Sequence, residues 1–565
     1  MSASPTAEAD RAAPDEVAVA VKRLIDDLSR PEALDLPAGA SVEVRQTHIS
    51  VVFLTRDRAY KVKKPVQLWG LVDYTDPERR RQLCEDEVTL NRRLAADLYL
   101  GTVPIVEQGG RLRVWHGPSE PPSDVRVVDA AVVMVRIPDV ASWAARVRGG
   151  FLAGWEVDDM ARRLADFHKA NRLSGAAARA ALPLGFVRVL RQNVRGTEEG
   201  VPDLFPAALH RGLVTRLARR VARARNRLRQ RAGEGRVVDG HGDLRLEHVV
   251  RYRGRVAVMD CIEFNDRLRH IDPLSDLAFL SMDLTANGRP DLAWQLEQAY
   301  LDRSADMDGA ALLPLFRSAR AHVRAKVDLV MSRDVSLPTE QRATKRRGAM
   351  RALVLAWRYA RTGATPPLVV MHGTSGAGKS VLASTLSPWF GADVLRSDII
   401  RKELAGLKPL DRPRSGDIPR IYGREMSART YEALHKRAAR ALSHGRPVIL
   451  DATYLLRESR DAARQMAKDL GVSFVLLDLR CDDDEIRRRL KDRAERGDDP
   501  SDAGVEVFEA QVSHRERVEA DEAAIVHQAG SPAEQTALTI ASALEAQVDA
   551  RRETLGAEPR GGTSS

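Results

Sequence analysis

The chain has 565 residues, enough for about two to four domains, because one domain takes about 100–200 residues. Apolar residues make up 44% and charged residues 30%, a composition that excludes a largely disordered or fibrous chain. The net charge of +10, from 89 basic and 79 acidic residues, is mild for this length. It suits phosphorylated ligands and permits nucleic acid without requiring it.

The termini, apolar runs and cysteines favour a cytoplasmic protein. No apolar run reaches the ~18–20 residues that span a bilayer, and the N-terminus lacks the basic and apolar stretches of a signal peptide. Cys84, Cys261 and Cys481 are too far apart for a metal-ligand spacing and do not form an even disulfide set. We therefore expect reduced thiols, no membrane contact, and disordered tails at residues 1–19 and 549–565.

A strand and a helix near the N-terminus predict an ion pair. On the candidate strand that begins at Arg58, Lys61 and Lys63 share one face. A capping box at Thr75–Glu78 then predicts the start of a helix, on which Glu87 lies in an otherwise apolar stripe with Leu83, Leu90 and Leu94. A carboxylate there is costly to bury unless it is paired, and Lys61 is the natural partner. The alternative is a glutamate at the edge of the stripe that reaches solvent.

A basic stretch follows at Arg211–Arg231, where apolar residues recur at helical spacing between arginines. This pattern favours an amphipathic helix with a solvated basic face over a nucleic-acid surface.

The next motif is typical of a kinase active site. His241-Gly-Asp243 is followed by His248 as the chain enters a strand, and a second strand, from Arg255, ends at Asp260. Kinase-type folds use such a pair of carboxylates, one near the acceptor hydroxyl and one on magnesium after a short hairpin. Asp272–Ala278 then opens a helix.

Together these motifs resemble the aminoglycoside phosphotransferase family, whose pattern is H-G-D-x-x-x-x-N, I-D, then D-P-x-x-D-L-A. The resemblance covers about residues 40–330 and implies a two-lobed kinase-like fold that binds ATP and Mg²⁺. It implies that Asp243 and Lys61 are catalytic, that Glu87 orients Lys61, and that Asp260 and His248 are metal ligands.

Three departures from that pattern stand out. His248 replaces the asparagine ligand of the second magnesium, although this hard ion prefers oxygen ligands. Arg45–Ser50 lies where a Gly-rich hairpin over the phosphates is expected. Asp260 and Asp276 are sixteen residues apart, a few more than the usual spacing, which leaves Glu263 as a rival metal ligand.

Beyond a Gly/Pro linker at 361–367, strands alternate with helices, which predicts a parallel sheet covered on both faces. The first strand leads into a complete phosphate-binding loop, G-x-x-x-x-G-K-S. Its backbone amides would face phosphate, Lys379 would reach the β- and γ-phosphates, and the Ser380 hydroxyl can bind magnesium. The predicted nucleotide-binding residues are Gly373, Thr374, Ser375, Gly376, Ala377, Gly378, Lys379, Ser380 and Val381.

Three further elements complete this predicted site. Ser397 can cap a helix that places Asp398 and Arg401 one turn apart, as a general base and an anion-holding group; the alternative is a helix start with an acid favoured by the dipole. Asp451 ends an apolar strand and supplies the carboxylate that coordination of magnesium or water requires. Arginines, including Arg493 and Arg496, lead into a loop that can fold over the phosphates.

These C-terminal motifs resemble the small P-loop kinases related to polynucleotide kinase, gluconate kinase and zeta toxin, over roughly residues 366–545. The resemblance implies that Asp398 is the base for the acceptor hydroxyl, and it leaves the acceptor open.

The sequence thus predicts an α+β, two-lobed kinase-like domain at 20–361 followed by an α/β P-loop domain with a parallel sheet at 362–548, of the AAA-type ATP-binding class. We expect an ATP- and Mg²⁺-dependent kinase that phosphorylates a hydroxyl of a small molecule. In one alternative the first domain is an ATP-binding pseudokinase sensor; in another the second phosphorylates nucleic-acid 5′-hydroxyls. Nucleic acid is possible as a partner but not favoured.

Overall fold

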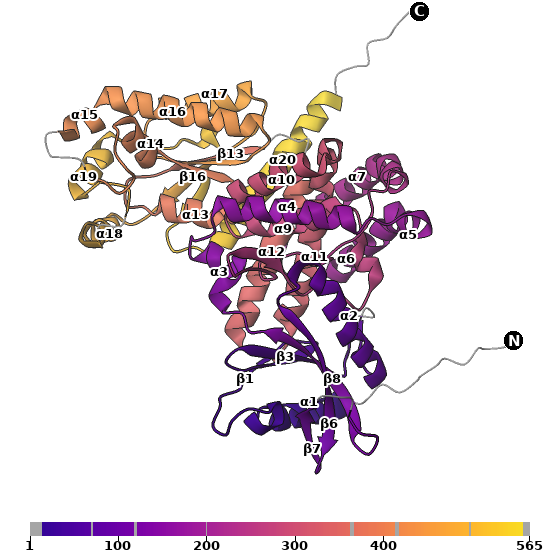
Figure 1. The fold of residues 1–565 in the computed structure, drawn as a ribbon. Helices are drawn as coiled ribbons and strands as arrows, with labels where there is room; N and C mark the ends of the chain where they lie inside the picture. Colours follow the sequence, from indigo (N-terminus) through magenta and orange to yellow (C-terminus); the bar gives the residue numbers. More distant parts are fainter. Residues whose placement is uncertain are drawn as a thin grey trace, which may run out of the picture. The chain divides into compact units, whose positions relative to one another are not determined.

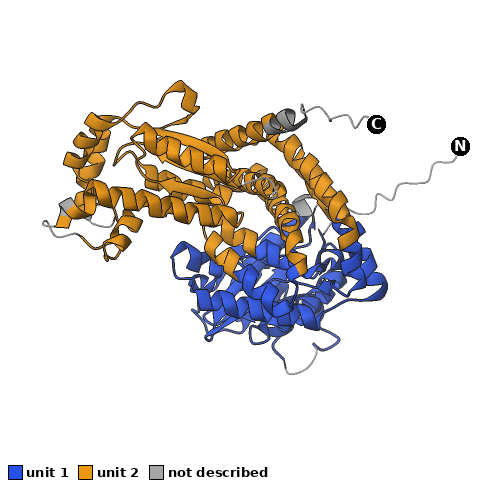
Figure 2. Cartoon of the chain, turned by 90° about the horizontal axis from the view of Figure 1, so that it is seen from above, with its two compact units in different colours: residues 1–186, 228–280, 296–307 blue, residues 187–227, 281–295, 308–565 orange. Residues whose placement is uncertain are grey.

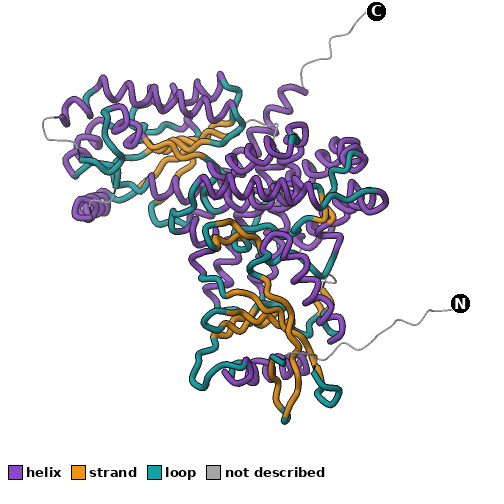
Figure 3. The backbone as a smooth tube through the Cα atoms, viewed as in Figure 1, coloured by secondary structure: helices purple, strands orange, loops and turns teal. Residues whose placement is uncertain are grey.

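The computed structural model describes residues 14–68, 72–117, 121–198, 200–361, 366–412, 417–496 and 499–556. The chain divides into two compact units, coloured separately in Figure 2. Unit 1 comprises residues 1–186, 228–280 and 296–307, and unit 2 comprises residues 187–227, 281–295 and 308–565. Figure 3 shows a sheet within each unit, surrounded by helices.

Unit 1 contains a six-stranded antiparallel sheet in the order β1-β2-β3-β8-β6-β7. Its strands are rich in β-branched residues that alternate between two faces, as half-buried strands require. One face packs on helix α1 and the other on helix α2. The bounds are α1 Pro14–Leu28, β1 Glu43–Gln46, β2 Ser50–Leu54, β3 Arg58–Lys63, α2 Pro77–Ala95, β6 Tyr99–Gln108, β7 Arg111–Val114 and β8 Arg126–Val135.

The cap of α2 differs from the predicted capping box. Asp76, not Thr75, is the N-cap residue, and its carboxylate accepts hydrogen bonds from the backbone N–H groups of Glu78 and Arg79. Pro77 occupies the first helical position, where no N–H donor is needed. Asp76 is placed to cap because the proline after it fixes where the helix begins.

The rest of unit 1 surrounds the predicted catalytic loop, residues 240–248. Helix α4 packs against the hairpin formed by β10 and β11, and α2 packs against β11. A short ladder of β9 with β12 lies at the start of the loop. The bounds are β4 Gln67–Leu68, β5 Val72–Asp73, α3 Trp143–Arg148, α4 Gly154–Ala170, α5 Gly175–Ala180, β9 Val238–Asp239, β10 Val249–Tyr252, β11 Arg255–Val258, α8 Asp266–Arg269 and β12 His270–Ile271.

Unit 2 contains a five-stranded parallel sheet in the order β14-β15-β13-β16-β17. Helices α16 and α17 cover one face and α13 lies on the other (Figure 1). The central strand β13 is buried along its whole length, as an apolar strand covered on both faces should be. The bounds are β13 Pro367–His372, α13 Lys379–Phe390, β14 Asp393–Arg396, α14 Ser397–Leu404, α15 Ile418–Tyr422, α16 Arg424–Ser443, β15 Val448–Asp451, α17 Arg457–Asp469, β16 Ser473–Arg480, α18 Asp483–Arg496, α19 Val505–His514, β17 Ile525–Gln528 and α20 Ala533–Gly556.

Helices from the preceding stretch of chain also belong to unit 2. Helix α11 (Leu313–Arg333) packs against α12 (Thr339–Ala360), and α12 packs against α13 and α20. The buried Trp357 indole donates a hydrogen bond to Glu545 of α20 at 3.0 Å, and Arg216 pairs with the same carboxylate at 2.7 Å. The division between the units falls within helices α6, α7, α9 and α10, and it separates only the first residue of α6 from the rest. The bounds are α6 Phe186–Glu198, α7 Ala207–Gly233, α9 Pro273–Ala286 and α10 Pro290–Ser304.

The basic stretch at 211–231 is helical, within α7. Leu217 and Leu228 are buried, as predicted from their spacing. Arg216 and Arg231 are also buried, and both are paired with carboxylates in their own units. These two arginines are therefore not part of a solvated basic face.

Ordered helices extend into both predicted tails. Helix α1 begins at Pro14 and α20 ends at Gly556, so residues 14–19 and 549–556 are helical rather than disordered. The reason is packing, because Leu24 and Leu28 of α1 and Ile540 and Leu544 of α20 are buried. Residues 1–13 and 557–565 lie outside the described residues. Within the described part of the chain, no helix is both long and apolar enough to cross a membrane.

Candidate active sites

The predicted lysine–glutamate pair forms in unit 1. The Lys61 ammonium lies 2.8 Å from Glu87 Oε1 and 2.8 Å from Asp260 Oδ1. Burial opposes the charged form of Lys61, but the carboxylates of Asp260 and Glu87 outweigh it and raise its pKa well above the ordinary value. Strand β3, helix α2 and the end of hairpin β10–β11 thus converge on one cation, as in a kinase-type phosphate site.

A second buried lysine extends this cluster. Lys63 lies 2.7 Å from Glu87 Oε2 and also pairs with Glu263, which accepts a hydrogen bond from the Tyr74 hydroxyl at 2.6 Å. Glu263 is therefore committed to protein donors, whereas the Asp260 side chain is 37% exposed. Of the two rival metal ligands, these contacts favour Asp260.

Replacing Glu87 tests this buried cluster. Glu87→Gln keeps the shape of the side chain but leaves two lysines with one carboxylate each, so we expect unit 1 to lose about 3 kcal/mol of stability. The measurement is the denaturant midpoint at which unit 1 unfolds. Glu85→Gln, on the exposed side of the same helix, is the matched control and should leave the midpoint unchanged. An unchanged midpoint for Glu87→Gln would mean that the buried pairs do not stabilise the fold.

The predicted catalytic loop is held by Asp276 of helix α9. The Asp276 carboxylate accepts hydrogen bonds from the backbone N–H groups of His241 at 2.6 Å and Gly242 at 3.0 Å. The His241 ring bonds the Met259 carbonyl at 2.9 Å, and burial lowers its pKa to about 4. His241 is therefore neutral and holds the loop through its hydrogen bond to Met259. Asp276 fixes the backbone that leads into Asp243.

His248 lies between the two predicted catalytic carboxylates. Its Nδ1 is 3.6 Å from Asp243 Oδ2, and its Nε2 is 3.9 Å from Asp260 Oδ2. Arg245, which sequence reasoning missed, contacts both carboxylate oxygens of Asp243 at 3.1 Å. Burial favours the neutral form of Asp260, but the charge and the hydrogen bond of the Lys61 ammonium hold its pKa far below the ordinary value. Asp260 is thus an anion that can bind a cation.

In place of a Gly-rich loop, the hairpin of β1 and β2 has a turn closed by Thr47. Its hydroxyl accepts hydrogen bonds from the backbone N–H groups of Ile49 and Ser50. Because the turn uses side-chain bonds, the hairpin forms without glycine.

In unit 2 the phosphate-binding loop joins β13 to α13. Gly376 and Gly378 have φ values of 86° and 100°, which glycine adopts without strain. A Cβ at Gly376 would also lie 2.8 Å from the side chain of Ile486, so α18 packs directly on the loop. The Lys379 ammonium donates a hydrogen bond to the Thr374 carbonyl at 2.8 Å, within the curve of the loop.

Lys379 has the acidic neighbours that the sequence predicted. Burial lowers its pKa, opposed by the carboxylates of Asp451 and Asp398. Burial raises the pKa of the Asp451 carboxyl, because it disfavours the charged form there too. Asp451 accepts a hydrogen bond from the Ser380 hydroxyl. A hydroxyl in the first turn of α13 and a carboxylate at the end of β15 suit magnesium, which prefers oxygen ligands. Among the described residues, no group of three or more His, Cys, Asp or Glu forms a preset metal site.

The predicted base and its arginine lie on α14, but Ser397 is not the cap. Arg396 occupies the N-cap position without a side-chain cap bond, and Ser397 is the first helical residue. Arg396 instead contacts Asp451 at 3.3 Å and Asp499 at 3.2 Å. Ser397 cannot cap because β14 runs directly into the helix.

Arg401 is buried without an ion-pair partner among the described carboxylates. Its Nη1 donates to Ser427 Oγ at 3.1 Å and to the Ile421 carbonyl at 3.3 Å, and its guanidinium lies over the Tyr422 ring. Its Nε has no hydrogen-bond partner. A buried cation without a counter-ion is a favourable place for an anionic group of a ligand.

Two arginines of α18, Arg489 and Arg493, lie near the phosphate-binding loop. Arg493 donates a hydrogen bond to the Ala503 carbonyl, and its charge acts on Lys379. The side chain of Arg496 lies outside the described residues. Arg489, one turn before Arg493, belongs to the predicted run of arginines but was not singled out: a Cβ on Gly378 would lie 3.5 Å from its Nη1. The spacing of four between the two arginines, which puts them on one helix face, is a signal that could have found it.

Gln511 of α19 is a second residue that sequence reasoning missed. Its Oε1 accepts a hydrogen bond from the Ser375 backbone N–H at 2.8 Å, and its Nε2 donates to Ser375 Oγ at 3.1 Å. Lys379 binds the carbonyl of the same peptide unit, Thr374–Ser375. The orientation of this peptide in the loop is therefore held from both sides.

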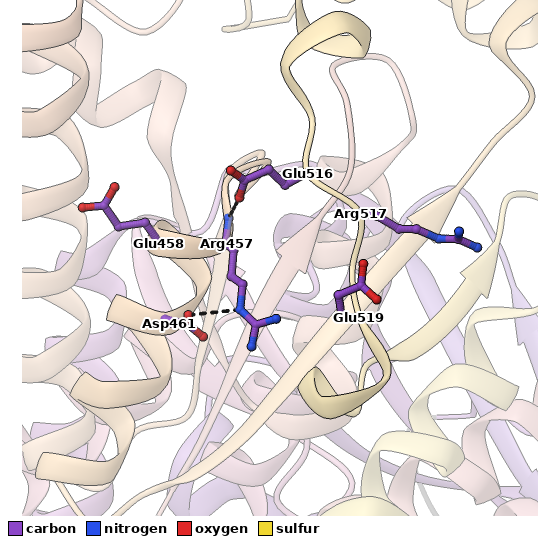
Figure 4. Close-up of a pocket in the computed structure, with 6 residues that line it drawn as sticks. All are labelled: Arg457, Glu458, Asp461, Glu516, Arg517 and Glu519. Carbon is purple, nitrogen blue, oxygen red and sulfur yellow. Dashed lines mark hydrogen bonds and ion pairs between the residues drawn. The ribbon is translucent and has the colours of Figure 1, made fainter.

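A separate cavity of about 680 Å³ lies beside α17. Figure 4 shows Arg457 there: its backbone N–H donates a hydrogen bond to Glu516, and its guanidinium pairs with Asp461. Carboxylates outnumber cations in its lining, so it is poorly suited to a polyphosphate. The lining residues are Arg457, Glu458, Asp461, Glu516, Arg517 and Glu519.

Comparison with known proteins matches two separate parts of the chain to two families. Residues 54–313 match the family described as "Phosphotransferase enzyme family", and residues 368–518 match the family described as "AAA domain". The protein is thus a kinase-type phosphotransferase with a kinase-like domain followed by a P-loop domain with a parallel sheet, as predicted. Because the family matches and the compact units divide the chain at different places, the boundary at residue 361 stays a prediction.

The chain also matches proteins over most of its length. It is 30% identical over 440 residues to the uncharacterized protein Rv2004c of Mycobacterium tuberculosis, covering 78% of this chain and 83% of the relative, and Mb2027c of Mycobacterium bovis matches equally. The chain belongs to the family of these mycobacterial proteins.

Solved structures match separate parts of the chain. One is a gluconokinase from Sinorhizobium meliloti, with a TM-score of 0.25 and 18% identity over 33% of this chain and 98% of that chain. Another is a choline/ethanolamine kinase family protein from Mesorhizobium loti, with a TM-score of 0.34 and 14% identity over 61% of this chain and 99% of that chain.

Proposed function

We propose that the P-loop domain transfers the γ-phosphate of ATP to a hydroxyl of a small molecule, with Mg²⁺ as cofactor. The observation that carries this proposal is the grouping of Lys379, Asp398 and Asp451 around one phosphate-binding loop. Lys379 would hold the β- and γ-phosphates, and Ser380 with Asp451 would hold magnesium. When bound, the ion neutralises phosphate charge.

Asp398 supplies the base. Its carboxylate acts electrostatically on Lys379 and on the hydroxyls of Tyr422 and Tyr431, which lie on the Arg401 side. A hydroxyl bound there would give its proton to Asp398 as its oxygen attacks the γ-phosphate. The buried, unpaired Arg401 favours an acceptor that carries a carboxylate, phosphate or sulfate beside that hydroxyl.

We also propose that unit 1 binds ATP with magnesium through Lys61, Glu87 and Asp260, with Asp243 as its base. Whether this half transfers phosphate or acts as a pseudokinase sensor is decided by Asp243→Asn, which lowers turnover only if the half is catalytic. A nucleic-acid acceptor would instead give binding that weakens steeply with salt. Both nucleotide sites and the acceptors are expected in the cytoplasm.

The test uses the full chain. Cutting at residue 361 would separate α12 from α13 and α20 and expose Trp357, which is 1% exposed. The intact protein is titrated with ATP-Mg and then screened against hydroxylated small molecules, anionic and neutral, for ADP release. Phosphate transfer to an anionic acceptor supports the proposal, and ATP turnover that no acceptor stimulates contradicts it.

A prediction for unit 1 concerns Asp260. Because Asp260 is the exposed carboxylate beside Lys61, Asp260→Ala should make ATP binding by unit 1 independent of magnesium. Hydrogen exchange of the full chain separates the two sites: protection of segment 241–263 by ATP should become the same with and without Mg²⁺. Protection of segment 373–381 should keep its magnesium dependence and is the internal control. If the protection of segment 241–263 by ATP still depends on Mg²⁺ in this variant, a residue other than Asp260 holds the ion.

A further inference from the structure

The catalytic loop of unit 1 contains a cation that the kinase pattern does not require. Arg245 contacts both carboxylate oxygens of Asp243 at 3.1 Å, Glu247 Oε2 at 2.7 Å and His248 Nε2 at 3.1 Å. The side chains of Arg245 and His248 are only 14% and 12% exposed. The guanidinium is therefore fixed by three partners at the centre of the loop.

The hydrogen bonds of His248 leave no lone pair for a metal. A guanidinium only donates, so Nε2 of the ring accepts from Arg245 and carries no proton. Nδ1 then carries the proton and donates to the Asp243 backbone carbonyl at 2.8 Å. A metal ion at Nε2 would have to displace Arg245, and it would stand about 3 Å from a like charge if it did not.

Kinase-type sites hold two magnesium ions, one through the aspartate after the hairpin and one through the catalytic-loop amide. In this chain Asp260 fits the first role, because it is an exposed oxygen ligand. Position 248 does not fit the second, because a nitrogen already bound by arginine replaces the amide oxygen. Arg245, at a variable position of the pattern, and His248, at the departing one, lie in contact. The histidine removes a metal ligand, and the arginine supplies positive charge beside it.

We propose that Arg245 takes the place of the second magnesium ion, so that unit 1 binds ATP with one divalent cation, held by Asp260. This inference rests on the proposed nucleotide site of unit 1. The guanidinium supplies a fixed single charge next to Asp243, and unlike a metal ion it cannot leave with the product.

Counting metal ions tests the proposal. The full chain is saturated with a non-hydrolysable ATP analogue, and bound Mn²⁺ is counted from the loss of the free-ion electron paramagnetic resonance signal. With two nucleotides per chain, we expect two Mn²⁺, one in each half. Three Mn²⁺ with two nucleotides would overturn the role of Arg245 while leaving the nucleotide sites intact. One nucleotide per chain would overturn the proposed site of unit 1 and this inference with it.

Variants of Arg245 and His248 test whether these two residues set the number of bound Mn²⁺ ions. The double variant Arg245→Leu with His248→Asn removes the cation and restores an amide oxygen, so the count should rise to three Mn²⁺ per two nucleotides. Arg251→Leu removes an exposed arginine of β10 and is the matched control, with an expected count of two. A double variant that binds two nucleotides but still two Mn²⁺ would also contradict the proposal. If the double variant does not fold, the wild-type count decides alone.

Discussion

Lys379→Ala is expected to abolish phosphate transfer by the P-loop domain while leaving the domain folded. The ammonium is the point charge for the β- and γ-phosphates, and no other described lysine donates a hydrogen bond into the loop. Because Lys379 is buried, with a pKa lowered by that burial, removing it also removes an unfavourable desolvation of the free protein. We therefore expect no loss of thermal stability.

The measurement is turnover with a responsive acceptor, with the unfolding midpoint recorded on the same sample. Lys491→Ala, an exposed position on α18, is the matched control and should keep full turnover. Full activity in Lys379→Ala would contradict the assignment of the loop as the phosphate site.

Asp398→Asn is expected to lower turnover by roughly 10²–10⁴-fold, the usual effect of removing a general base. ATP affinity should stay near normal, because the asparagine keeps the shape and Lys379 still holds the phosphates. The result separates two roles of Asp398, since it also occupies the first turn of α14, where an acid favours the helix dipole.

Measuring kcat and the Kd for ATP on the same variant distinguishes these roles. If Asp398 is the general base, kcat falls in Asp398→Asn while the Kd for ATP stays unchanged. Loss of ATP binding together with melting of the helix would instead show that Asp398 serves the start of α14.

The parts of the candidate sites that could be predicted from the sequence are those marked by local motifs. The phosphate-binding loop is contiguous, and its glycines have the left-handed φ values that the motif requires. The Lys61–Glu87 pair was predictable because one acid in an apolar helical stripe needs a cation. Each inference starts from a pattern within one loop or one helix.

The contacts that escaped prediction join distant parts of the chain. Ser375 and Gln511 are 136 residues apart, Arg396 and Asp499 are 103 apart, and Lys63 and Glu263 are 200 apart. No local periodicity relates such partners, because the order of strands in each sheet brings them together. The cap of α2 was misplaced by one residue for a simpler reason, since two adjacent residues could both cap and the following proline selects the nearer one.

The central claim, that the P-loop domain phosphorylates a small molecule, is tested most directly by following the γ-phosphate. The full chain is incubated with ATP labelled at the γ-phosphate and an extract of small hydroxylated metabolites, beside Asp398→Asn and Asp243→Asn. We expect labelled small organic phosphates with the wild type and their loss in Asp398→Asn. Label found only in inorganic phosphate or on nucleic acid, or transfer that Asp398→Asn leaves unchanged, would contradict it.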